Sequence, residues 1–494
     1  MEQGDISFSR SLSARKGDFM LGFFFFAIYI FIYGMMVFRF GLHQDEVLDI
    51  DGGATSTYVA AGRWGMALYR FLMGKGMAPW ADGVTAGVFL CVALVLQTRL
   101  FELKGGVQFF YGIFALGTIQ FSYVLVYSFQ SAPVALGLLC ATASARLLKS
   151  GDTGWRGYAA VVGILVYAVA CYQVCAIYFL VLLAGLYFRG QFAVRRVMQA
   201  VICLAGACCI WYVVRAVSMI WVSDEVKQYV LDYQKGMTQW HTLPGKGVEV
   251  WVLFVLHYLK IMHLHALGCQ YAGQWVYASA MFPLIFLVVK EFRTGRRRIE
   301  LLLRVGLLYF IWVAPFTMTL LMGTVQGART NLAEPLSCAF LWGTFLAETR
   351  VSPLRMVLIV ILSCVVLLRG SVAVSRFAFF EKLDFERWMT SLRTIELQAA
   401  ELANNAGLTD YRVYCCNLNK RPSKKIGWFL PIERGIDPVK AGTLMWYAEP
   451  WKLEHLNLPE RGLFPKKIRQ APSWPNPDSF VIFGGNIYVR VDNL

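Results

Sequence analysis

Charged residues are scarce in this sequence of 494 residues. Asp, Glu, Lys and Arg together make up 16% of the chain, whereas soluble globular proteins average about 25%. Hydrophobic residues make up 57%, and they are grouped into runs of the length that crosses a bilayer, which is about 20 residues. The scarcity of charge therefore argues against an ordinary soluble protein and predicts a polytopic α-helical membrane protein.

Several motifs of soluble enzymes are also missing. The sequence has no Walker motif, which argues against an ATP-driven pump, and no GxSxG motif typical of serine hydrolases. It has 12 cysteines but no CxxC pair, so we predict no zinc or redox site and no resident cofactor. The net charge is +16, but Lys and Arg stand in short loops between apolar runs, so we expect no nucleic-acid partner.

The apolar runs predict about eleven transmembrane helices. The run at 157–188 is too long for one straight helix and short for two full spans, and arginines flank it. We therefore expect two short helices that meet near Tyr172 and Gln173. The expected spans lie near residues 19–40, 81–100, 107–127, 129–148, 157–188, 197–222, 275–289, 301–322, 335–346 and 356–372.

The positions of Lys and Arg predict the orientation, because these residues are enriched in cytoplasmic loops. Arg10, Arg15 and Lys16 precede the first span and place the N-terminus in the cytoplasm. Segments 41–80 and 223–274 are then external. The apolar stretch near 251–259 is expected to lie in the membrane interface.

The composition changes after the last span and divides the chain into two domains. Residues 1–372 form the membrane domain, and residues 373–494 form a soluble domain that the odd number of spans places outside. Helical spacing at 385–406 and strand-like runs at 411–418 and 480–491 predict a small α+β fold for it.

The first external loop begins with an acidic pair, Asp45 and Glu46. Carboxylates at the membrane face are costly to place without a role. Either one is a candidate base that takes a proton from a sugar hydroxyl, and the structural alternative is a solvated loop start. The pair would also suit a divalent metal, but no third ligand is evident, and we predict no metal site.

Cations on the external side are candidates for binding phosphate. Arg63 and Arg70 lie on a segment with helical spacing, where they either hold phosphate or reach to lipid headgroups. Lys260 and Arg329 are further candidates by position and charge. Tyr172 and Gln173, at the expected helix break, either line a polar cavity for the acceptor or bond between helices.

Several of these features together resemble the bacterial and phage O-antigen glucosyltransferases that convert serotype, which are membrane enzymes of the C-type glycosyltransferase architecture. The resemblance covers residues 19–372 and rests on the acidic pair after the first span, on Gly62-Arg63, on Tyr172-Gln173 and on segment 329–343.

Two positions depart from the family pattern. Glu46 stands where the family often has a second aspartate, and Trp64 stands where it has a proline. Either Asp45 or Glu46 therefore remains the candidate base, and Arg63 would hold the donor.

The resemblance implies a hexosyltransferase of the bacterial inner membrane with a periplasmic C-terminal domain. Its donor would be undecaprenyl phosphate bearing one sugar, usually glucose, and its acceptor the O-antigen of lipopolysaccharide. Two other functions stay open: a transporter or flippase of a lipid-linked sugar, and a non-catalytic envelope assembly factor.

Overall fold

The computed structural model describes most of the chain. The described residues are 2–38, 55–74, 78–150, 154–268, 274–325, 328–349, 352–408, 413–416, 470–473, 475–483 and 485–490. Contacts divide the chain into two units, residues 1–39 with 54–375, and residues 40–53 with 376–494. The predicted domain boundary and loop assignments stay predictions.

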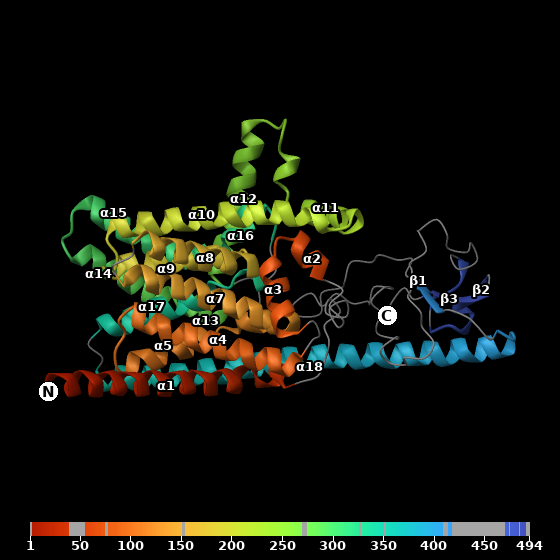
Figure 1. Ribbon diagram of the computed structural model, residues 1–494, viewed down its shortest axis with the longest axis horizontal. Helices are drawn as coiled ribbons and strands as arrows, with labels where there is room; N and C mark the ends of the chain where they lie inside the picture. Colours follow the sequence, from red (N-terminus) through yellow and green to blue (C-terminus); the bar gives the residue numbers. More distant parts are fainter. Residues whose placement is uncertain are drawn as a thin grey trace. The chain divides into compact units, whose positions relative to one another are not determined.

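The described part of the first unit is helical, which confirms a polytopic helical membrane protein (Figure 1). Eight helices in the described residues are long and apolar enough to cross a membrane, or nine if the bent pair α5 and η2–α6 counts as one span. The total of about eleven spans stays a prediction. The helices of this unit are α1 (Glu2–Val37), α2 (Thr55–Ala60), α3 (Trp64–Met73), α4 (Pro79–Leu100), α5 (Gly106–Gly117), η2 (Ile119–Phe121), α6 (Ser122–Leu125), α7 (Ser128–Lys149), α8 (Trp155–Cys171), α9 (Cys175–Phe188), α10 (Val194–Ser218), η3 (Met219–Trp221), α11 (Asp224–Met237), η4 (Trp240–Thr242), α12 (Val248–Ala266), α13 (Trp275–Ser279), α14 (Met281–Arg293), α15 (Arg298–Val313), η5 (Ala314–Phe316), α16 (Thr317–Met322), η6 (Ala328–Thr330) and α17 (Glu334–Glu348).

The expected break inside 157–188 is confirmed. α8 ends at Cys171, Tyr172 has an extended backbone, and α9 begins at Cys175. α7 packs against both short helices, so protein surrounds the interrupted backbone. A break at this depth is tolerated in such surroundings.

Glycines let α1 pack closely against its neighbours α4 and α5. A Cβ atom at Gly87 would overlap the ring of Tyr29, and one at Gly112 would overlap the ring of Phe25. The Tyr29 hydroxyl also donates a 2.8 Å hydrogen bond to the carbonyl of Gly83. Small residues at such crossings are typical of membrane helices, because they allow backbones to approach.

The first and last spans also lie together. α18 (Pro353–Asn405) donates a 3.0 Å hydrogen bond from the Ser371 hydroxyl to the Phe31 carbonyl of α1. Its Val366 side chain packs against Gly117, where a Cβ atom would collide with it. α1 is therefore held by both early and late parts of the unit.

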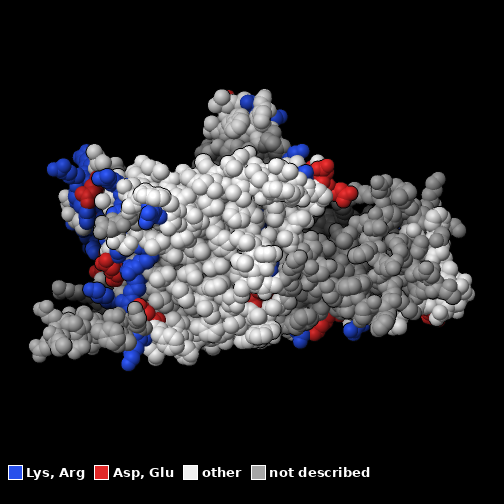
Figure 2. All heavy atoms as spheres, viewed as in Figure 1, with Lys and Arg blue, Asp and Glu red and all other residues white. Residues whose placement is uncertain are grey.

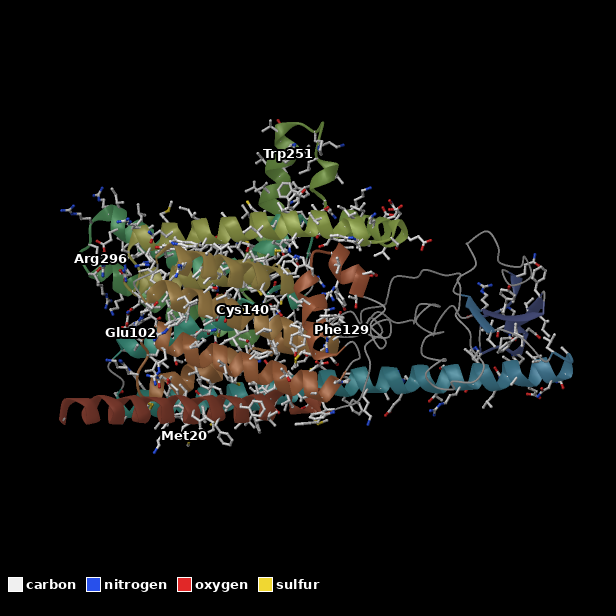
Figure 3. The ribbon with its side chains drawn as sticks, viewed as in Figure 1. Met20, Glu102, Phe129, Cys140, Trp251 and Arg296 are labelled. Atoms are coloured by element: carbon white, nitrogen blue, oxygen red, sulfur yellow. The ribbon has the colours of Figure 1, made fainter. Side chains whose placement is uncertain are left out.

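Basic residues gather at one end of the first unit, which we call the basic end (Figure 2). α4, α7, α9, α14 and α17 finish there, and α5, α8, α10, α15 and α18 start there. Carboxylates at this end are paired: Glu291 accepts from Arg304 at 2.7 Å and Glu348 from Lys290 at 2.7 Å. Figure 3 places Glu102 and Arg296 at the basic end and Phe129 at the opposite end.

The segment between α10 and α13 packs onto the end of α16. The Trp240 indole donates a 2.8 Å hydrogen bond to the Leu321 carbonyl. The backbone N–H of Gln239 donates a 3.1 Å hydrogen bond to the Met322 carbonyl. Figure 1 shows α12 crossing the direction of α10. By length and composition α12 is also a candidate span, so its interfacial position stays a prediction.

The described part of the second unit refines two expectations. Residues 385–405 are helical, as their spacing predicts, but they belong to α18, which runs unbroken from Pro353 to Asn405, and no Gly or Pro occurs between Ser371 and Ala406. Residues 480–490 form two strands, β2 (Phe480–Phe483) and β3 (Asn486–Arg490), since Gly485 turns the chain with φ +77°. The sheet order is β1-β3-β2, with β1 (Val413–Cys416) parallel and β2 antiparallel to β3.

Candidate functional site

The turn between α2 and α3 is held by side chains from distant parts of the chain. Gln173 donates to the Ala61 carbonyl at 3.1 Å, and Trp211 donates to the Gly62 carbonyl at 2.7 Å. Arg215 donates at 3.3 Å to the carbonyl of residue 60. Three donors from the α8–α9 break and α10 thus fix a short turn, which determines where the next residue points.

Gly62 is required at the centre of this turn. Its φ is +78°, a left-handed conformation that glycine adopts without strain. A Cβ atom there would lie 2.7 Å from the Trp211 ring and 3.3 Å from the Gln173 amide nitrogen. The Gly62-Arg63 pair is therefore needed for backbone geometry, whatever Arg63 binds.

The structure brings together three residues that the sequence singled out. The guanidinium carbon of Arg63 lies 4.8 Å from the centroid of the Tyr172 ring, and Gln173 bonds to the turn just before Arg63. Tyr172 is buried and Arg63 is half-buried. A cation over an aromatic face is held in place while its N–H groups stay available to an anion.

Arg70 has a different role from the one considered for it. Its guanidinium forms a 2.8 Å ion pair with Asp82, and the two side chains are 4% and 7% exposed. It also donates at 3.3 Å to the Ser128 carbonyl and lies 4.3 Å from the centroid of the Phe129 ring. Because Arg70 is buried and neutralised, it neither reaches headgroups nor offers a free charge to phosphate.

A second arginine lies at the same end of the unit as Arg63. The Arg329 guanidinium carbon is 4.9 Å from the centroid of the Tyr127 ring. Tyr127 is the residue directly before the first residue of α7. Gln120 donates a hydrogen bond to the neighbouring Ala328 carbonyl, which anchors the loop that carries Arg329. The N-terminus of a long helix carries partial positive charge.

A continuous set of contacts joins the two arginines. The backbone N–H of Arg63 donates a 2.7 Å hydrogen bond to the Tyr58 carbonyl. The Tyr58 ring is stacked on Phe129, with centroids 5.3 Å apart and planes at 12°. Phe129 lies two residues from Tyr127, on which Arg329 rests. The first turn of α7 thus links both cations, at the end opposite the basic end.

One buried carboxylate at this end is not among the residues that the sequence singles out. Glu334 opens α17 and is 1% exposed. The signal was an acid directly before Pro335 at the start of an apolar run. An acid in the first helical turn is stabilised by the helix dipole.

The other predicted site residues are not joined to this group by the described contacts. Lys260 is exposed on α12, which packs mainly against α15, η5 and α16. Asp45 and Glu46 lie outside the described residues. Within the residues that the structure does describe, no group of three or more His, Cys, Asp or Glu side chains is arranged to hold a metal ion.

Comparison with known proteins does not assign a family. No protein-family model, no curated protein and no solved structure matches this chain.

Proposed function

We propose that this protein is a glycosyltransferase that moves a sugar, glucose in the first instance, from a polyprenyl-phosphate donor to lipopolysaccharide O-antigen. The observation that supports it best is the linked pair Arg63 and Arg329 beside the N-terminus of α7. Each guanidinium lies over a tyrosine ring at one end of a membrane-embedded helical unit. That arrangement suits a phosphate whose lipid tail lies among the helices.

The proposed chemistry needs one base and a stabilised leaving group. Asp45 or Glu46 takes the proton from an acceptor hydroxyl, and the acceptor oxygen forms a bond to C1 of the donor sugar. The bond from C1 to the phosphate oxygen breaks, and polyprenyl phosphate leaves with the electron pair. Arg63 and Arg329 stabilise the charge that develops on that phosphate, so no general acid is needed.

Connectivity supports the involvement of the acidic pair. Asp45 and Glu46 stand in the sequence between Phe38, which follows α1, and Thr55, which opens α2. α2 leads directly into the turn that carries Arg63. The base and the donor cation would thus belong to one external segment, on the periplasmic side of the bacterial inner membrane.

The placement of buried charge disfavours a transporter or flippase. Alternating access predicts ionisable residues at mid-membrane. In the described part of the chain, the buried Asp, Glu, Lys and Arg residues are Arg70, Asp82, Glu291 and Glu334. Each lies in the first or last turns of its helix, α3, α4, α14 or α17. None of them lies in the middle of its helix, so the distribution does not match the mid-membrane charges that alternating access predicts.

The test is analysis of cell-surface polysaccharide from cells that carry the wild type, Asp45→Asn, Glu46→Gln or the double variant at matched membrane levels. We expect one single variant and the double variant to lose a side-branch sugar. Arg297→Ala, which changes an exposed arginine of the basic end, is the matched control and should retain it. Full modification by the double variant would refute the assignment of the base. Translocation of a lipid-linked sugar without any transfer would favour the transporter.

A further inference from the structure

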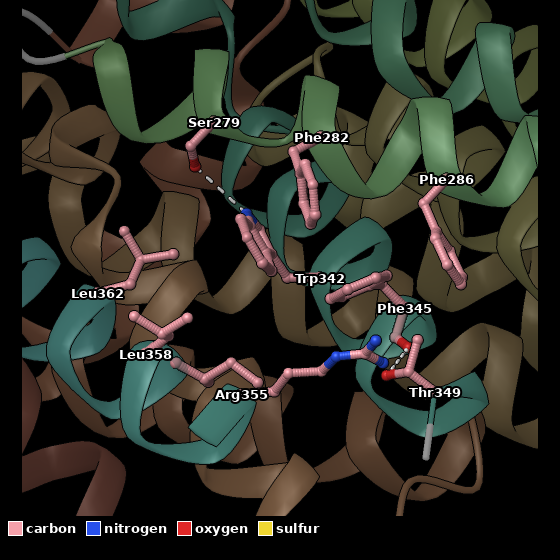
Figure 4. Close-up of a pocket in the computed structure, with 10 residues that line it drawn as sticks. Ser279, Phe282, Phe286, Trp342, Phe345, Thr349, Arg355, Leu358 and Leu362 are labelled. Atoms are coloured by element: carbon pink, nitrogen blue, oxygen red, sulfur yellow. Dashed lines mark hydrogen bonds between the residues drawn. The ribbon is translucent and has the colours of Figure 1, made fainter. Parts of the chain in front are cut away.

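A cavity of about 600 Å³ lies between α13, α14, α17 and α18 of the first unit (Figure 4). Aromatic and aliphatic side chains dominate its wall. The wall includes Ser279, Phe282, Trp342, Thr349, Arg355 and Leu358. Thr349 follows α17 and Arg355 lies in the first turn of α18, so the cavity reaches the basic end.

The cavity opens on the surface that faces lipid. Phe282 and Leu358, on opposite walls, are 60% and 56% exposed. Deeper in the cavity, the Trp342 indole donates a 3.2 Å hydrogen bond to the Ser279 hydroxyl, which satisfies the indole N–H. An apolar cavity open to the bilayer and without an unsatisfied indole donor favours a hydrocarbon chain over water.

One cation lines this cavity. Figure 4 shows the Arg355 side chain extended along the wall toward Thr349. The nearby Glu348 already pairs with Lys290 at 2.7 Å and lies 3.8 Å from Arg189. Among the described residues Arg355 has no ion-pair partner.

The first turn of α18 contributes a second attraction for an anion. This turn contains no acidic residue, although an acid is the usual complement to the positive end of a helix dipole. A guanidinium and a helix N-terminus at the mouth of an apolar cavity fit one ligand class, a phosphate attached to acyl chains. Basic pockets between membrane helices bind anionic headgroups in this way.

We propose that this cavity binds a diacyl phospholipid with an anionic headgroup, with its phosphate on Arg355 and one acyl chain between Phe282 and Leu358. The site is at the opposite end from Arg63 and Arg329. The inference is therefore independent of the glycosyltransferase proposal and survives if that proposal fails.

The experiment is native mass spectrometry of the full-length protein, titrated with phosphatidylglycerol or with phosphatidylcholine of the same acyl chains. We expect the wild type to bind phosphatidylglycerol about fivefold more tightly, the factor given by one interfacial cation. Arg355→Gln should remove that preference, and Leu358→Trp should weaken both lipids by filling the cavity. Arg297→Gln, at an exposed basic-end arginine outside the wall, should behave as wild type.

Three outcomes would overturn the proposal. One is equal affinity of the wild type for the two lipids. Another is an equal loss of preference in Arg355→Gln and Arg297→Gln, which would indicate a diffuse surface charge. The third is displacement of phosphatidylglycerol by undecaprenyl phosphate through Arg355, which would assign the cavity to a polyprenyl lipid. Melting temperatures of all three variants within error of the wild type establish that each remains folded.

Discussion

The guanidinium carbon of Arg63 lies 4.8 Å from the centroid of the Tyr172 ring. Arg63 belongs to the turn between α2 and α3, and the ring belongs to the interrupted backbone between α8 and α9. The Tyr172 ring therefore restrains the Arg63 guanidinium at this turn.

Removal of Arg63 should impair transfer without unfolding the protein. Arg63→Ala is expected to lower the initial rate of sugar transfer in membranes about 100-fold, the effect of losing one donor to a developing charge. Tyr172→Phe keeps the aromatic face and should change the rate only a few-fold. Arg156→Ala, whose arginine lies over Trp155 at the basic end, is the control. A wild-type rate for Arg63→Ala would contradict the role given to Arg63.

The buried pair of Arg70 and Asp82 should contribute to stability rather than to chemistry. Arg70→Met or Asp82→Leu alone leaves an uncompensated buried charge and should lower the free energy of unfolding by about 3–5 kcal/mol. The double variant should recover most of that loss. Unfolding in detergent, followed by circular dichroism, measures it. Additive losses in the double variant would show that the two residues do not act as a pair.

The turn at Gly62 should tolerate no side chain. Gly62→Ala combines a left-handed φ with a Cβ contact of 2.7 Å to Trp211, and we expect it to destabilise the turn by about 1–3 kcal/mol. Transfer activity should fall with it. Gly163→Ala, in the middle of α8 with no atom within 4 Å of the new Cβ, is the matched control. If both variants melt and function alike, the turn is not restrained as described.

The pair of Glu102 and Lys149 should make a small contribution to the free energy of unfolding that depends on pH. The 2.8 Å hydrogen bond from Lys149 holds the pKa of Glu102 below its usual value. The pair therefore stabilises the folded state at neutral pH, and its contribution is lost as the pH falls through the lowered pKa. Because Glu102 is exposed, the effect should stay below about 1 kcal/mol. Melting temperatures of wild type and Lys149→Met should converge at low pH, and a constant difference would contradict the pairing.

Much of the membrane architecture could be predicted because the bilayer imposes a simple length rule. Apolar runs located the helices, and the arginines on both sides of 157–188 required the break at Tyr172-Gln173. The sequence does not predict the continuity of α18, because the change in composition after residue 372 is typical of the end of a span. Helix geometry does not require an end there, since polar and apolar residues without Gly or Pro propagate the same helix.

The candidate site could be predicted only in part. Arg63, Tyr172 and Gln173 were named from the sequence, and the structure joins them. The neutralisation of Arg70 by Asp82 depends on how α3 and α4 pack, which no local pattern encodes.

The hydrogen bond between Ser371 and Phe31 has a consequence for biosynthesis. α1 is synthesised before α18, and the two residues that this hydrogen bond joins are 340 positions apart in the chain. Until α4 enters the bilayer, the Tyr29 hydroxyl lacks its Gly83 acceptor, and an unpaired hydroxyl in hydrocarbon costs a few kcal/mol. In the nascent chain, α1 therefore lacks contacts that it has in the folded protein. A chain released before Ser371 would expose an uncovered seam to quality-control proteases.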